Sequence, residues 1–234
     1  MALVTADQVR NGRGDEVALA DGERELTWSA LDDVLNRATN ALLSMVERDD
    51  PDGHRRIAVF ARNSVEVVAV HFAAHLAGVS SVPTSSLLGV DELAYILGDS
   101  KATCVFAGPD TAKVAIAAAK QAGVARVVLW RTPDHAGGEG LRVTAWDQWL
   151  AGAPSDEPTT WQAPRYALLY TSGTTGRPKG TQIRVQPSLR DTVGEWIPAL
   201  GEGIAAAGLP HLVVGPLHHT GPFVVMRTSR PARR

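Results

Sequence analysis

The stretch IAVFARNSVEVVAVHFAAHLAGVSSVP, residues 57–83, decides the fold class, because it contains a complete strand–helix–strand pattern. The run IAVFA has strand composition. Ser64 then opens a helix as its N-cap, and Gly78 ends that helix by accepting a left-handed backbone. VSSVP follows as a second short apolar strand. Two apolar strands joined by a helix are typical of parallel pairing in an α/β sheet.

The alternation of short apolar strands and helices continues on both sides of this unit. Apolar spacing predicts a helix that starts at Ser29 within residues 25–46, and further helices at residues 90–97 and 111–123. It predicts strands at residues 102–108 and 125–130. In the first of these helices we expect Ser29 to be the cap, with Asp32 reaching back to it. A connector rich in Pro and Gly, residues 151–164, reads as a surface linker within one domain. The pattern predicts a layered α/β fold of mostly parallel sheets flanked by helices.

Composition excludes several classes of protein. The 234 residues are 44% apolar and carry a net charge of −2, which excludes a disordered chain and argues against nucleic acid as a partner. The single cysteine, Cys104, lies in an apolar run, so we expect it to be buried, in a protein of the reducing cytoplasm. Uncharged stretches at residues 67–90 and 203–226 are interrupted by Pro, Gly and His, so we expect no transmembrane segment.

A second stretch, LLYTSGTTGRPKG at residues 168–180, contains the residue types that suit a ligand-binding loop. It follows YALLY, which predicts one more buried strand, so the loop should leave the ligand-facing edge of the sheet. Glycines allow close approach of a ligand, while hydroxyl groups and one lysine suit a phosphate chain. A Walker loop fits poorly, because Pro178 replaces its glycine and Gly180 replaces its Ser or Thr. A polar loop without a ligand is the remaining alternative.

The stretch LLYTSGTTGRPKG closely resembles the phosphate-binding signature of the adenylate-forming (AMP-binding) superfamily. Residues 25–43, residues 56–108 and the stretch PLHHTGPF also resemble the acyl-CoA synthetase branch, in the same order, so that about residues 10–227 are covered. The resemblance implies an ATP-dependent acid–thiol ligase. A small-molecule carboxylate would attack ATP to give an acyl-adenylate, and a thiol, coenzyme A or a carrier protein, would then displace AMP.

The resemblance also implies which residues bind the substrates. The β- and γ-phosphates, together with magnesium, would be held by Thr171, Ser172, Gly173, Thr174, Thr175, Gly176 and Lys179. In PLHHTGPF, His219 matches a position beside the acyl and nucleotide pocket, although the paired histidines could equally satisfy backbone groups in a turn. His71 and His75 are four residues apart, but no third ligand is suggested, so we read them as packed histidines and assign no metal ligand.

Parts of the family pattern are missing. The sequence has no aromatic-Gly-x-Thr-Glu stretch, no Thr-Gly-Asp stretch and no match to the C-terminal lysine, so we assign no catalytic residue. We interpret residues 1–227 as a partial, incomplete N-terminal adenylation domain, residues 228–234 as an Arg-rich divergent tail, and the small C-terminal domain as absent. We expect the truncated chain to be inactive alone and to associate through uncovered apolar surface. A degenerate module that binds a nucleotide or a partner is the alternative.

Overall fold

The computed structural model describes residues 4–49, 52–133, 138, 140–159, 162–163, 165–171, 177–182, 212–219 and 222. Its centre is a five-stranded parallel sheet in the order β4-β3-β5-β6-β7. The strands of this sheet are β3 (Arg56–Phe60), β4 (Ser80–Thr84), β5 (Cys104–Ala107), β6 (Arg126–Leu129) and β7 (Arg142–Ala145). Because β4 lies on one side of β3 and β5 on the other, the chain reverses its direction of winding between these strands.

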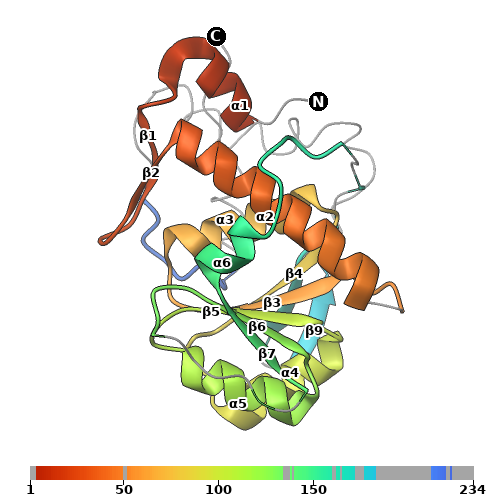
Figure 1. Ribbon diagram of the computed structural model, residues 1–234. Coiled ribbons are helices and arrows are strands. Elements are labelled where there is room, and N and C mark those ends of the chain that lie inside the picture. The colour runs from red at the N-terminus through yellow and green to blue at the C-terminus, as the bar shows by residue number, and fades with distance from the viewer. Residues whose placement is uncertain are drawn as a thin grey trace.

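Helices cover both faces of the sheet (Figure 1). On one face lie α2 (Trp28–Asp49), α3 (Val65–Leu76) and α6 (Trp146–Ala151), and on the other lie α4 (Val90–Ser100) and α5 (Ala112–Ala122). Outside the layers are α1 (Val4–Gln8), a π-helical turn (Val9–Arg13) and a hairpin of β1 (Val17–Ala20) with β2 (Glu25–Thr27). The predicted layered α/β class is confirmed.

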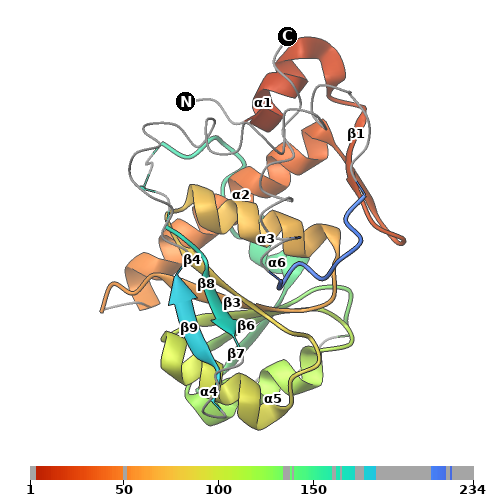
Figure 2. The same cartoon turned by 180° about the vertical axis from the view of Figure 1, so that it is seen from behind.

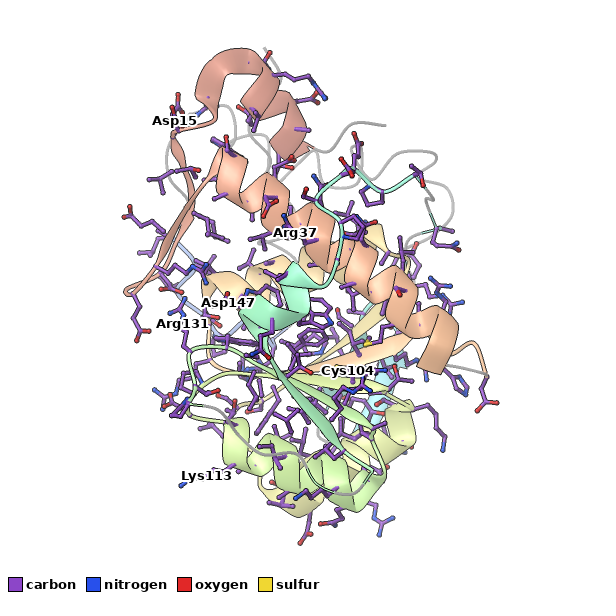
Figure 3. The ribbon with its side chains drawn as sticks, viewed as in Figure 1. Asp15, Arg37, Cys104, Lys113, Arg131 and Asp147 are labelled. Carbon is purple, nitrogen blue, oxygen red and sulfur yellow. The ribbon has the colours of Figure 1, made fainter. Side chains whose placement is uncertain are left out.

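The apolar strands are explained by burial on both faces. Along β3, Ile57 and Val59 pack with α2 and α3, whereas Ala58 and Phe60 pack with α4 and α5. Side chains of a strand alternate between the two faces, so a strand covered on both sides needs apolar residues throughout. Cys104 is fully buried in the interior, as expected (Figure 3). Among the described residues, no helix has the length and apolar character needed to span a bilayer.

The predicted ends of α3 are confirmed. Ser64 caps the helix, because its hydroxyl accepts a hydrogen bond from the Val67 N–H at 3.3 Å. Gly78 follows the helix with φ +61°, and an added Cβ there would lie 2.5 Å from the Gln162 side chain. Gly78 is therefore required both by its left-handed backbone and by the close passage of residues 162–163.

The predicted start of α2 is wrong. Thr27, rather than Ser29, caps this helix, since its hydroxyl accepts from the Ala30 N–H at 3.2 Å. Ser29 lies inside the first turn, and its own N–H donates to Gly14 O at 3.0 Å. The Asp32 carboxylate faces α1, where it accepts a hydrogen bond from Thr5. Contacts with the N-terminal segment therefore engage Ser29 and Asp32, the two residues that the sequence predicted for the cap.

A partly buried cluster of charges joins the β1–β2 turn to α3 and to the end of β6. Arg131 donates two hydrogen bonds to the Glu66 carboxylate, at 3.0 and 2.9 Å, and also bonds Asp21 at 2.7 Å and Glu23 at 2.9 Å. The Glu66 side chain is only 1% exposed, and Arg24 supplies its second cation at 3.1 Å. Figure 3 shows Arg131 below the hairpin, where it links three segments that are distant in sequence.

The segment after α6 runs over the surface along α2, as the linker interpretation predicts. Arg37 donates to Ala153 O at 2.9 Å, and Asn40 donates to Pro154 O at 3.0 Å. Figure 1 shows this segment following α2, with Arg37 labelled in Figure 3. These bonds fix the path by which the chain returns to the sheet before the stretch that carries the site.

Candidate functional site

The stretch predicted to bind phosphate begins and ends in an antiparallel hairpin. β8 (Leu168–Thr171) pairs with β9 (Lys179–Gln182) in a two-stranded sheet of its own. The expectation that β8 extends the parallel sheet is therefore wrong. A parallel neighbour needs a long crossover, whereas the chain here turns back within a few residues and pairs with itself.

The hairpin is anchored to the main sheet and to the α4 face. Leu168 and Leu169 are buried, and Leu168 packs in the core that α4 and α5 form with the sheet. Ser80 of β4 donates to Tyr166 O at 2.6 Å, just before β8 begins. Figure 2 shows β8 and β9 beside β4, with the turn end of the hairpin near α4.

Two predicted phosphate-binding residues are brought together at the turn end of this hairpin. Thr171 and Lys179 are direct Cα partners in the antiparallel ladder, and both are exposed. A hydroxyl and an ammonium group thus lie side by side where the two strands separate. The other predicted members, Ser172, Gly173, Thr174, Thr175 and Gly176, lie outside the described residues. A paired hydroxyl donor and cation can bind the oxygens of a phosphate group.

Helix α4 contacts both ends of the hairpin turn, which sequence reasoning missed. The Tyr170 hydroxyl donates to the Asp99 carboxylate at 2.5 Å, and the Tyr95 hydroxyl donates to Pro178 O at 3.3 Å. The Arg177 guanidinium lies 5.4 Å from the centre of the Tyr95 ring. The four-residue spacing of Tyr95 and Asp99 was visible in the sequence, but nothing local pairs that helix face with residues 170–178.

The environment of Tyr170 keeps its hydroxyl protonated. Burial raises the pKa of Tyr170, and the hydrogen bond to the Asp99 carboxylate raises it further. The ring lies across the facing strand, where Gly180 makes room for it. A Cβ at Gly180 would be 3.1 Å from the Tyr170 ring, so glycine suits this position.

His219 lies on a different support, residues 212–219. Asn63, in the loop after β3, accepts from the Leu217 N–H at 2.8 Å and donates to Gly215 O at 2.9 Å. Leu217 is buried on the α2–α3 side, and the exposed His219 closes a turn by donating its N–H to Pro216 O at 3.0 Å.

The two histidines of this turn lie close together, with ring centres 4.4 Å apart. Burial lowers the pKa of His218, and the neighbouring His219 lowers it further. The described residues therefore place Thr171 with Lys179 on the β8–β9 hairpin and His219 beside the loop after β3, on two separate supports.

The histidines of α3 lie apart from this site. His71 is 4% exposed within the helix. Within the described part of the chain, no group of three His, Cys, Asp or Glu residues is placed to hold a metal ion.

Comparison with known proteins finds relatives among CoA ligases. The long-chain-fatty-acid–CoA ligase FadD13 of Mycobacterium tuberculosis is 28% identical over 174 residues, which are 73% of this chain and 32% of that protein. The 4-hydroxybenzoate–CoA/benzoate–CoA ligase of Rhodopseudomonas palustris is 29% identical over 176 residues, 74% of this chain and 31% of that protein. The chain spans about a third of the length of these relatives.

The fold also matches solved structures. The N-terminal domain of FACL13 from Mycobacterium tuberculosis superimposes with a TM-score of 0.63 at 21% identity, covering 99% of this chain and 56% of that one. The family model described as "AMP-binding enzyme" matches residues 6–227, which include the described hairpin ends and His219. On this match over nearly all of its length, the chain belongs to the AMP-binding enzyme family.

Proposed function

We propose that this chain is the ATP-binding part of an acid–thiol ligase, which activates a carboxylate as an acyl-adenylate and transfers the acyl group to coenzyme A. The observation that carries the proposal is the opposed pair Thr171 and Lys179 at the turn end of the β8–β9 hairpin, within the region that the family model matches. The acyl-CoA and aryl-CoA ligases among the relatives support the reaction class. The reaction would take place in the cytoplasm, where the reduced thiol of Cys104 is stable.

In this reaction the substrate carboxylate is the nucleophile, and the protein stabilises the negative charge that develops. The substrate carboxylate attacks the α-phosphorus, the bond to the bridging oxygen breaks, and pyrophosphate leaves with the electron pair. Lys179 would offset the negative charge that develops on the leaving group, and Thr171 would donate a hydrogen bond to a phosphate oxygen. The amides and hydroxyls of Ser172, Gly173, Thr174, Thr175 and Gly176 would complete this phosphate site, with magnesium bound to the nucleotide.

His219 would line the acyl and nucleotide pocket. Its support favours this role, because the segment is fixed by burial of Leu217 and by the Asn63 side chain, which accepts one hydrogen bond from the segment and donates another to it. The ring is left exposed on a fixed backbone, as a pocket-lining side chain requires. Replacing His219 by Ala should therefore weaken binding of an acyl-adenylate analogue more than binding of inorganic tripolyphosphate.

Titration calorimetry with MgATP tests the phosphate site. Lys179→Ala should raise the Kd about 10- to 100-fold, because a hydrogen bond to a charged group contributes roughly 1.5–3 kcal/mol. Lys113→Ala is the matched control, since Lys113 is an exposed lysine of α5, far from the hairpin (Figure 3). Equal MgATP affinity of the two variants would remove the basis of the proposal.

A non-catalytic module that binds a nucleotide or a partner is the second candidate. It is kept because transition-state stabilisation needs groups around the whole nucleotide, and the described residues supply only Thr171 and Lys179 on the hairpin and His219 on a separate support. We therefore expect the 234-residue chain by itself to bind MgATP without carboxylate-dependent ATP–pyrophosphate exchange. Exchange above the level of Lys179→Ala would instead identify the isolated chain as an enzyme.

Self-association through apolar surface belongs to the same proposal. The side chains of Leu212 and Val214 are 79% and 89% exposed, and Leu87 is 85% exposed. Apolar side chains at such exposure favour contacts with another protein surface. Sedimentation velocity over a concentration series should show reversible association, and a single monomeric species at every concentration would contradict it.

A further inference from the structure

One face of α4 contacts both strands of the hairpin that carries Thr171 and Lys179. Tyr95 and Asp99 are four residues apart, so their side chains lie on the same side of the helix. Asp99 accepts the hydroxyl of Tyr170, the residue before Thr171. Tyr95 donates to the carbonyl of Pro178, the residue before Lys179. The helix thus contacts each strand one residue away from a predicted phosphate ligand.

These contacts constrain the direction of the hairpin as well as its position. The face of the Tyr95 ring lies 5.4 Å, measured from the ring centre, from the Arg177 guanidinium. The Tyr95 hydroxyl at the same time donates a hydrogen bond to the carbonyl of Pro178. On the other strand, the Tyr170 ring crosses over Gly180 to reach α4, with no side chain between them. Each strand is therefore held both by a hydrogen bond and by contact of an aromatic ring.

The helix itself is a firm support for these contacts. Leu93, Ile96 and Leu97 of α4 are at most 2% exposed and pack under the sheet. Glu92 fixes the first turn by accepting from the Gly89 N–H at 2.9 Å. A rigid, buried helix that contacts both strands can hold two ligand groups at a fixed spacing, which reduces the ordering needed when a ligand binds.

We propose that Tyr95 and Asp99 are positioning residues of the triphosphate site, and that α4 sets the affinity for phosphate by fixing the spacing of Thr171 and Lys179. This inference rests on the proposed function. Neither residue contacts the phosphates. Both act through the backbone and side chains of residues 170 and 177–178.

Two measurements on the whole chain test the inference. Hydrogen exchange of the ligand-free protein follows the amides of residues 168–171 and 179–182, and titration calorimetry gives the Kd for magnesium tripolyphosphate and for AMP. Tyr95→Phe and Asp99→Ala should speed exchange of the hairpin amides and raise the tripolyphosphate Kd about three- to tenfold, in proportion to one lost hydrogen bond. AMP, which lacks the outer phosphates, should bind with unchanged Kd.

A matched control separates this effect from general damage to α4. Asp91→Ala removes the same charge from the same helix, but the Asp91 carboxylate accepts from Gln121 of α5 at 3.0 Å and has no hydrogen bond to the described residues of the hairpin. In Asp91→Ala, the rate of amide hydrogen exchange in the hairpin and the Kd for tripolyphosphate should equal those of the unmodified chain. Asp99→Asn keeps an acceptor for the Tyr170 hydroxyl, so it should recover part of the affinity that Asp99→Ala loses.

The outcomes distinguish this inference from the proposed function. Unchanged hairpin exchange in Tyr95→Phe and Asp99→Ala overturns the inference. It is also overturned if exchange rises while the tripolyphosphate Kd stays the same and Lys179→Ala weakens binding, in which case the proposed function stands. If Lys179→Ala has no effect on binding, the proposed function falls, and the positioning role falls with it.

Discussion

Replacement of Arg131 by Met tests how much the buried charge cluster contributes to stability. The substitution keeps the apolar stem and removes the guanidinium that donates two hydrogen bonds to Glu66, whose side chain is 1% exposed. Removing one partner of a buried ion pair costs roughly 3–5 kcal/mol, because the remaining charge stays desolvated.

Three features of the structure lower this value. The Arg131 side chain is 21% exposed, and Arg24 remains 3.1 Å from the Glu66 carboxylate after the substitution. Asp21 also keeps its backbone hydrogen bonds from Glu23, Arg24 and Val65. We therefore expect the free energy of unfolding at pH 7 to fall by about 2–3 kcal/mol.

Urea unfolding of Arg131→Met beside Arg62→Met measures the difference. Arg62 pairs with Asp110 at 3.3 Å, but both side chains are mostly exposed, at 74% and 66%. Such a surface pair contributes about 0–1 kcal/mol, so the control variant should unfold near the midpoint of the unmodified chain. Losses that agree within about 0.5 kcal/mol for the two variants would refute the argument from burial.

The pH dependence of the Arg131 effect has a definite sign. Burial alone would raise the pKa of Asp21, but hydrogen bonds from Arg131 and from the backbone outweigh it and hold the pKa well below its usual value. A lowered folded-state pKa contributes stability above the unfolded-state pKa, about 3.9, and that stability is lost as the pH falls below it. The difference between the unmodified chain and Arg131→Met should shrink between about pH 5 and pH 2. A difference that grew on acidification would contradict the assignment.

Three further predictions concern the interior. Gly78→Ala should lower the thermal midpoint more than Gly123→Ala. Both positions have positive φ, but only a Cβ at Gly78 would meet other atoms, at 2.5 Å. Similar losses for the two variants would count against the steric argument. Thr111→Val should cost about 1–3 kcal/mol in urea unfolding, because its buried hydroxyl bonds the Phe60 carbonyl at 2.6 Å, and a neutral result would mean that this bond contributes nothing. The thiol of Cys104, 0% exposed, should react with a thiol reagent only after denaturation, and rapid labelling of the native chain would disagree with its burial.

The local elements followed from the sequence by itself, and the prediction of a phosphate ligand for the loop also rests on the sequence alone. Period and capping act over a few residues, so the β3–α3–β4 unit, the Ser64 cap and the left-handed Gly78 could be predicted from residues 57–83. Hydroxyl groups, glycines and one lysine in residues 171–180 favoured a phosphate ligand. That inference is also local, because it needs only the side-chain types.

The tertiary structure decided how these parts combine. Pairing of β8 with β9, the choice of Thr27 over Ser29 as a cap, and the contact of α4 with both hairpin strands depend on residues far apart in the sequence. The Arg131 cluster likewise joins positions 21, 66 and 131. Such contacts depend on shared burial and on charge partners across the whole fold, and local propensity determines neither.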